Sequence, residues 1–226
     1  MVKIMANYDF EITSRPSYSL LKINLKDQEI MTETGSMVYK DNGVNIETSA
    51  KGGVLGVLKR AVVGESIFMN KLSGSGRIAL APGYSGDIVH HELNGTLYAS
   101  SGAYLASSSD LSIDTKFGGG KTFFGGKGLF LMKIEGSGDV FLSSYGAVEE
   151  IELNNESIMV DNGNLVAFTG DLNYNLGKVG GLKSTLLGGE GLVYNFSGTG
   201  KIYIQTRNIE SFIDFITPYL PMPKQG

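Results

Sequence analysis

The chain has 226 residues, a formal net charge of -4 at pH 7 from 19 basic and 23 acidic side chains, and no cysteine. The missing cysteine excludes disulfides, thiolate catalysis and cysteine-based zinc sites, and it favours a reducing compartment. The acidic balance and the scattered basic residues argue against a phosphate-tracking surface, so we expect no nucleic-acid partner.

Glycine content and hydropathy narrow the class of protein further. The chain contains 32 glycines, about twice the usual share of roughly 7%, which predicts many tight turns. No run of about 18 or more apolar residues is present, so we expect no membrane span. The opening residues lack the apolar stretch of a secretory signal, which makes the cytoplasm the expected location.

Strand signals begin near the N-terminus and then recur. Residues 8–12 and 18–25 alternate apolar and polar side chains on either side of Pro16. Three later segments, each 62 residues from the next, place a Gly-x-Gly pair before an apolar strand. The glycines are Gly74 and Gly76, Gly136 and Gly138, and Gly198 and Gly200. Because glycine tolerates positive φ, we expect these residues to be structural turns that reverse the chain between strands.

The constant interval predicts three tandem repeats. Each copy also holds an alternating strand and an apolar run, at 67–69, 129–132 and 192–194, that reads as buried on both faces or between subunits. Units of about 60 residues are too small to bury a core alone and must pack on one another. We therefore predict an all-β fold of three tandem β-sandwich-like repeats, divided at 1–94, 95–154 and 155–208, with a terminal segment at 209–226.

Only the C-terminal segment has helical periodicity. Asn208 is a candidate N-cap, and the apolar face that follows consists of Ile209, Phe212, Ile213 and Ile216. Pro218 is expected to end this helix, and the tail 218–223 is expected to be extended. The helix is predicted to cover the protein's own sheet or a subunit seam, with docking of a different partner as the alternative.

Two glycine-rich segments resemble phosphate-binding motifs but lack the required context. Residues 118–122 end like a phosphate-binding loop, yet Thr115 stands where that loop needs glycine, and strand signals follow instead of a helix. Residues 74–79 fit a loose dinucleotide fingerprint, but the two sister copies do not, and all three continue into strands. We therefore predict no cofactor.

The only two histidines, His90 and His91, stand next to Glu92. On a strand His90 and Glu92 share one face, which gives too few ligands for a typical metal site. We interpret the segment as a polar strand face, with a bound divalent cation or a histidine pH response as the alternative. A solvent-facing position is predicted for the charged residue after each glycine pair, which is Arg77, Asp139 or Lys201. No catalytic, cofactor-binding or metal-binding residue is assigned, and we expect no enzyme.

Three segments carry a family resemblance. Residues 188–207, GGEGLVYNFSGTGKIYIQTR, resemble the closing motif of the altered-inheritance-of-mitochondria family number twenty-four, and residues 64–70 and 81–88 are similar to its first half. The resemblance implies a triplicated β fold like that of the tryptophan RNA-binding attenuation protein (TRAP), in pseudo-threefold arrangement, and prokaryotic members without an assigned biochemical role. The mitochondrial role is not carried over, because the chain shows no transit peptide.

Two functional hypotheses from different classes follow. The first is a non-enzymatic homo-oligomeric assembly or scaffold protein, because glycines and apolar strand residues repeat while polar positions vary. The alternative is a small-molecule or RNA-binding protein that uses the seams between repeats, by analogy with the attenuation protein.

Overall fold

The computed structural model describes residues 8–49, 69–114, 131–178 and 192–221. These residues form a mostly β structure, with a 13-stranded sheet whose paired strands are antiparallel. The one α-helix among them, α3 (Ile209–Ile216), lies near the C-terminus. The predicted β class with a short C-terminal helix is confirmed.

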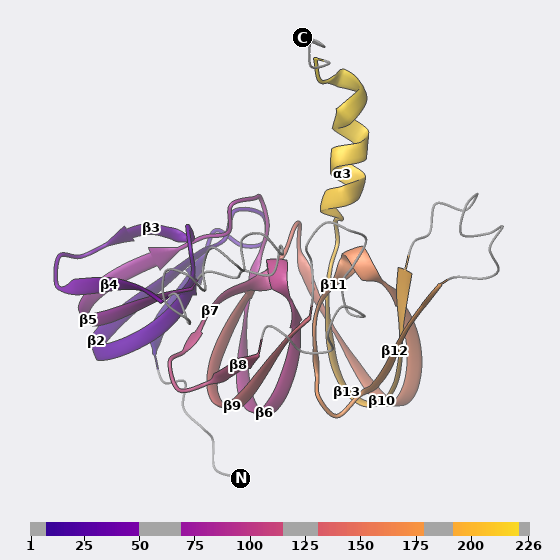
Figure 1. The fold of residues 1–226 in the computed structure, drawn as a ribbon, viewed down its shortest axis with the longest axis horizontal. Coiled ribbons are helices and arrows are strands. Elements are labelled where there is room, and N and C mark those ends of the chain that lie inside the picture. Colours follow the sequence, from indigo (N-terminus) through magenta and orange to yellow (C-terminus); the bar gives the residue numbers. More distant parts are fainter. Residues whose placement is uncertain (1–7, 50–68, 115–130, 179–191, 222–226) are drawn as a thin grey trace, which may run out of the picture.

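The strands fall into three groups along the chain, which we call the first, second and third unit (Figure 1). The first unit contains β1 (Asp9–Thr13), β2 (Leu20–Glu33), β3 (Met37–Lys40), β4 (Val44–Ser49) and β5 (Met69–Leu80). The second contains β6 (Ile88–Ser100), the 3-10 turn η1 (Ser101–Ala103), β7 (Tyr104–Ser108), β8 (Ser112–Asp114) and β9 (Leu131–Ser143). The third contains β10 (Val148–Asp161), the 3-10 turn η3 (Asn162–Asn164), β11 (Leu165–Thr169), β12 (Asn173–Lys178) and β13 (Leu192–Gln205).

Strand pairing follows one scheme in all three units. The last long strand of each unit pairs with the first long strand and with both short strands: β5 with β2, β3 and β4; β9 with β6, β7 and β8; β13 with β10, β11 and β12. Neighbouring units join where β7 pairs with β2 and where β11 pairs with β6.

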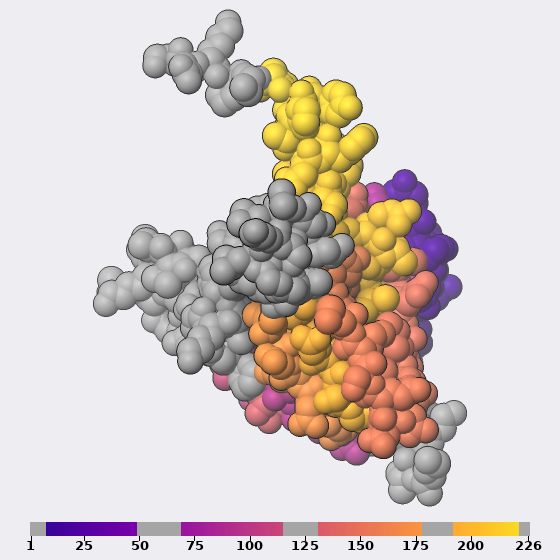
Figure 2. Space-filling model, turned by 90° about the vertical axis from the view of Figure 1, so that its right-hand side faces the viewer, coloured from indigo at the N-terminus to yellow at the C-terminus, as the bar shows by residue number. Residues whose placement is uncertain are grey.

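The sheet has two ends. Its strand order is β10-β13-β11-β6-β9-β7-β2-β5-β3, so β3 and β10 each have one neighbour along this path. Figure 1 places β3 and β10 at opposite sides of the molecule. Figure 2 looks onto the end that carries β10, where residues of the third unit form much of the surface.

Alternation along the strands builds the core. On β2, Leu21, Ile23 and Leu25 are buried, and the polar residues between them face outward. Three apolar clusters result, and each draws residues from two units: the first unit's cluster includes Ile88 and Phe141, the second's includes Val166 and Tyr203, and the third's includes Leu131. The core is therefore continuous across both junctions.

Four described residues of the apolar runs are buried inside the chain, whereas Met69 and Leu192 are half-buried. Leu131, Met132, Val193 and Tyr194 are all at most 3% exposed, so they are unavailable to another subunit. Residues 67–68 and 129–130 of these runs lie outside the described residues. For these four residues the prediction of strands buried on both sides is correct, and the alternative of burial between subunits is wrong.

The Gly-x-Gly pairs do not reverse the chain, and this corrects the turn prediction for all six glycines. They lie inside the continuous strands β5, β9 and β13. Gly74, Gly136 and Gly198 have φ of 120°, 130° and 116°, a region open to glycine, and Gly76 also has positive φ. Opposite two pairs the ladder register shifts at Asp27 and at Asn155. The glycines therefore bend a long strand that stays in the sheet.

The segments that connect successive units lie side by side with the segment before β2. Tyr18, Gly86 and Gly146 form successive parallel bridges. The backbone N–H of Ser19 donates to the carbonyl of Gly86 at 3.0 Å, and that of Asp87 donates to the carbonyl of Gly146 at 2.9 Å. A β-carbon on Gly86 would lie 1.5 Å from the carbonyl oxygen of Ser144, so only glycine fits at this position.

Helix α3 begins and ends as the sequence predicts. Asn208 Oδ1 accepts the backbone N–H of Glu210 at 2.8 Å, which confirms the N-cap, and the helix ends at Ile216 before Pro218. The tail differs from the prediction, because 217–219 form the 3-10 turn η4 (Thr217–Tyr219) before the chain becomes extended at Leu220. None of the described helices is long and apolar enough to cross a membrane.

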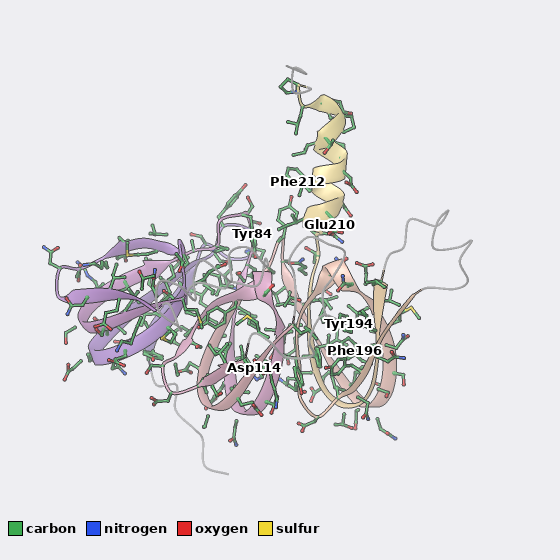
Figure 3. All side chains as sticks on the ribbon, in the orientation of Figure 1. Tyr84, Asp114, Tyr194, Phe196, Glu210 and Phe212 are labelled. Atoms are coloured by element: carbon green, nitrogen blue, oxygen red, sulfur yellow. The ribbon has the colours of Figure 1, made fainter. Side chains whose placement is uncertain are left out.

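The helix stands away from the sheet (Figure 1), and no residue of α3 is buried. Its base is held by an aromatic contact, in which the rings of Phe212 and Tyr145 lie 5.8 Å apart. Figure 3 shows Phe212 at this lower end of the helix, on the side of Tyr84. The prediction that the helix covers the protein's own sheet is wrong for the described residues, since its apolar face remains exposed.

Candidate functional site

The polar residues that the sequence singles out lie on β6 and on the strands beside it. His90 Nε2 is 2.7 Å from Asp139 Oδ1 on β9. The imidazole also contacts two phenylalanine rings, with centroid distances of 4.7 Å to Phe10 and 5.1 Å to Phe141. Strand β1 of the first unit thus covers a histidine of the second unit, and the pair helps to fix their junction.

Asp139 is buried rather than solvent-facing, with 1% of its surface exposed. Its backbone N–H donates to Ser108 Oγ at 2.9 Å, and its carboxylate reaches His90 diagonally across the ladder. The prediction of a common exposed position is therefore wrong for Asp139. It holds for Arg77, whose exposed guanidinium pairs with Asp41, while Lys201 is intermediate in exposure.

The third unit carries a matching ion pair. Glu150 and Lys201 occupy the ladder positions that correspond to His90 and Asp139, because Glu150 lies opposite Tyr203 as His90 lies opposite Phe141. Their charged atoms are 2.5 Å apart. The acidic partner lies on β9 in the second unit and on β10 in the third, so the two units place a polar contact at the same ladder position with the residue types exchanged.

His91 points to the opposite face and meets the third unit. Its Nδ1 lies 2.9 Å from the hydroxyl of Tyr203 on β13, with the two rings edge to face at 5.6 Å. Burial, followed by Coulombic interactions with His90 and Lys201, lowers the pKa of His91 to about 4. His91 is therefore neutral at pH 7 and acts as a hydrogen-bonding contact between units.

Asp87 anchors the loop that precedes β6. Arg15 binds both of its carboxylate oxygens at 2.8 Å, and the hydroxyl of Ser19 and the backbone N–H of Ile88 each donate to Oδ1 at 2.8 Å. Burial opposes ionisation of Asp87, but these hydrogen bonds outweigh it and lower the pKa of the carboxyl. Arg15 and Asp87 therefore form a salt bridge between the first and second units, next to Gly86.

Glu33, at the end of β2, is a carboxyl that titrates near neutrality. Its partial burial raises the pKa to about 7. Its environment includes the hydroxyls of Tyr84 and Tyr104, whose own pKa values are raised by burial. The group is a candidate for a pH response, but nothing among the described residues positions it against a substrate.

A groove lies on the third unit, between β10, β12 and β13. It has a volume of about 440 Å³, and its lining includes the amides and hydroxyls of Ser157, Asn173, Asn175, Asn195 and Ser197 together with Met159 and Tyr174. Phe196 lies behind these residues in the core, beside Tyr194 (Figure 3). No histidine, carboxylate or lysine is among the lining residues, and Tyr174 is the titratable side chain among them, so this groove could bind a polar group.

The remaining sequence motifs do not form sites. Residues 74–79 lie within β5, with no helix after them, so the dinucleotide reading is excluded. Residues 118–122 lie outside the described residues. Among the described residues, no group of three or more His, Asp or Glu side chains could hold a metal ion. His90 and Glu92 share a face as predicted, and His90 is engaged by Asp139.

Sequence reasoning missed the contacts made by Asp139, Tyr203 and Arg15, of which the last two join neighbouring units. Each contact joins residues at least 49 positions apart, so spacing alone does not reveal it. The sequence does contain one signal for the contact between Asp139 and His90. Only the second repeat has an acidic residue after its glycine pair, and only its partner strand carries histidines.

Comparison with known proteins places the chain among relatives without a stated function. It is 34% identical over 225 residues to an uncharacterized protein of Streptococcus pyogenes serotype M6, covering 94% of this chain and 91% of that protein. A crystal structure of a Streptococcus pyogenes protein is similar in fold, with a TM-score of 0.79, 31% identity, and coverage of 94% of this chain and 100% of that one. The family described as mitochondrial biogenesis AIM24 matches residues 10–207. The chain therefore belongs to this AIM24 family.

Proposed function

We propose that the protein is a non-enzymatic homo-oligomeric assembly protein, built from three tandem TRAP-like β units. The shared pairing scheme of β5, β9 and β13 supports the tandem arrangement. Two ends of the sheet and an uncovered helix support assembly, because soluble chains rarely leave large apolar groups clustered on the surface.

The observation that carries this proposal is the apolar face of α3. Phe212, Ile213 and Phe215 are 46%, 42% and 67% exposed on a helix that touches the sheet only near its base. The other face carries Glu210 and Asp214, and the helix has no basic residue. An anionic membrane surface would repel this helix, whereas a second copy can bury its apolar face.

The polar sites described above favour a structural role over catalysis. His90, His91 and Asp87 are each bound by a residue from another strand or loop, at a junction between units. The groove on the third unit has no histidine, carboxylate or lysine in its lining. Binding of RNA has less support, because the outer strand β10 carries the acidic residues Glu149, Glu150, Glu152 and Glu156.

Light scattering of the full chain tests the proposal. The parent should scatter as a multiple of 24.2 kDa at micromolar concentration. Replacing Phe212 and Ile216 by Ser should shift the mass towards the monomer, because both lie on the apolar face. The matched control, Ser211→Ala with Asp214→Ser, changes the opposite face and should leave the mass unaltered. A parent that remains at 24.2 kDa at all concentrations would overturn the proposal.

A further inference from the structure

The two ends of the sheet expose apolar side chains in the described part of the chain. On β3, Met37, Val38 and Tyr39 are 41%, 56% and 41% exposed, and on β10, Met159 is 55% exposed. Each strand has an outer edge that pairs with no described strand. Unpaired edges with apolar side chains are templates for strand addition.

The junctions inside the chain show what each edge accepts. At the first junction, Ala106, Ser107 and Ser108 of β7 pair with Thr32, Met31 and Ile30 of β2. At the second, Ala167, Phe168 and Thr169 of β11 pair with Ala99, Tyr98 and Leu97 of β6. In both cases the short second strand of one unit lies on the outer edge of the preceding unit's first strand.

The two junctions use one register. In the first unit Ile30 lies opposite Leu72, which is two positions before Gly74. In the second unit Leu97 lies opposite Ile134, which is two positions before Gly136. On the other side, Ala106 and Ala167 lie opposite Phe141 and Tyr203, each three positions after the second glycine. A register that recurs at both junctions is a property of the unit and not of one sequence context.

The two free edges belong to strands that are equivalent to those paired at the internal junctions. In the third unit Ile158 lies opposite Phe196, two positions before Gly198, so β10 corresponds to β2 and β6. In the first unit Tyr39 lies opposite Ala79, three positions after Gly76, so β3 corresponds to β7 and β11. Since β3 and β10 lie at opposite sides of the molecule (Figure 1), they cannot meet within one chain.

We infer that β3 of one copy pairs antiparallel with β10 of a second copy, with Tyr39 opposite Val160 and Lys40 opposite Met159. The inference rests on the proposed assembly function and adds the two sheet ends as a contact beside the apolar face of α3. Such a contact is head to tail, because two different surfaces meet, and repeated rotation closes it into a ring or extends it as a filament. A symmetric dimer does not follow from this geometry.

The side chains fit this register. Met159 would be covered by the aliphatic stem of Lys40, as Tyr98 is covered by Phe168 at the second junction, where the rings stack at 5.0 Å. Lys40 makes no ion pair among the described residues. In the inferred pairing its diagonal neighbour on the same face is Asp161, which gives the ammonium group an anionic partner.

Disulfide trapping tests the register, because the chain has no cysteine of its own. Lys40→Cys and Met159→Cys variants are mixed, oxidised and separated without reductant. Residues directly opposite in an antiparallel pair have Cα atoms about 4.5–5.5 Å apart, within disulfide range, whereas diagonal neighbours lie about 7–8 Å apart and beyond it. The mixture should give a covalent dimer at least about tenfold more abundantly than Lys40→Cys mixed with Ser157→Cys.

Each single variant alone should give no dimer. Dimers from Lys40→Cys alone would mean that two β3 edges pair, and this would overturn the inference. Equal yields with Met159→Cys and Ser157→Cys would overturn the register. An oligomeric parent that gives no mixed dimer would overturn the edge pairing and leave the proposed function intact, whereas a parent that scatters as a monomer would overturn both.

Charge reversal gives an independent test in solution. Met159→Lys places two ammonium groups opposite each other and should weaken each contact by about fivefold or more, and adding Lys40→Glu should restore it. Ser112→Lys, at an exposed position of β8 in the second unit and away from both sheet ends, is the matched control and should leave assembly unchanged. Assembly that is insensitive to Met159→Lys, or loss that Lys40→Glu does not rescue, would contradict the inferred contact.

Discussion

Gly86 shows how a single missing β-carbon fixes the path of the chain. The loop that contains it passes so close to Ser144 that an added β-carbon would overlap a backbone oxygen at 1.5 Å. Gly86→Ala must therefore displace one of the loops and break hydrogen bonds between them. We expect the free energy of unfolding to fall by at least about 3 kcal/mol, measured by urea denaturation.

Gly83, in the same loop, is the matched control. A β-carbon there meets nothing within 4 Å, and its φ lies outside the region reserved for glycine. Gly83→Ala should change the free energy of unfolding by no more than about 0.5 kcal/mol. If both variants unfolded at the same urea concentration, the close packing at Gly86 would make no measurable contribution to the free energy of unfolding.

His91 predicts a defined pH dependence of stability. Its pKa is about 4 in the folded state and ordinarily 6.5, so the unfolded chain binds a proton that the folded chain does not between these values. The contribution is complete above pH 6.5 and is lost as pH falls towards 4, with a slope of about 1.4 kcal/mol per pH unit at its steepest. His91→Gln should remove this slope.

The measurement compares parent and variant by denaturation at pH 7.5, 6, 5 and 4.5. Other acidic groups titrate in both proteins and cancel in the difference between their unfolding free energies. That difference should shrink as pH falls. A constant difference across this range would show that His91 is protonated equally in both states.

Residue-level environments were the least predictable part of the candidate site. Asp139 reads as an exposed charge, since its counterparts are Arg77 and Lys201, yet it is buried against His90. It contacts His90, and the ring of that histidine packs against Phe10 of β1 in the first unit. Local patterns carry no record of such tertiary contacts.

At the scale of elements, the N-cap of α3 can be tested independently of the sheet. Asn208 Oδ1 accepts the backbone N–H groups of Glu210 and Ser211 at 2.8 and 3.4 Å. Asn208→Ala should destabilise the helix by about 1 kcal/mol, and Asn208→Asp should retain it. The measurement is amide exchange within 209–216, with the strands as an internal reference. Equal exchange in both variants would show that the cap is not needed.

Elements with strong local signals were predictable, and their connections were less so. The helix was predictable because its apolar spacing, N-cap and proline all agree, and the strands because their alternation is regular. The glycine pairs misled because glycine at positive φ serves both a reversing turn and a bend within a strand. Which of these occurs depends on whether partner strands continue past the glycines, as β2, β6 and β10 do.

At the scale of the whole molecule, assembly should couple stability to concentration. If copies cover the ends of the sheet, association stabilises only the folded state, and the melting temperature rises with protein concentration. A hundredfold increase should raise Tm by about 5 °C in the parent. Met159→Lys should reduce this rise, while the Tm of the variant at the lowest concentration should stay near that of the parent. A concentration-independent Tm in the parent would contradict coupling of this kind.

The core clusters that cross both junctions also determine how the molecule opens. The second unit is packed on two sides, whereas the first and third units each lack one neighbour. Thermal fluctuations should therefore fray the sheet from β3 and β10 inward, and amide hydrogens of β6 and β9 should exchange last. In an assembled ring no unit is terminal, so this gradient of protection should flatten. The exchange pattern would then report, strand by strand, whether a given copy is alone or joined to others.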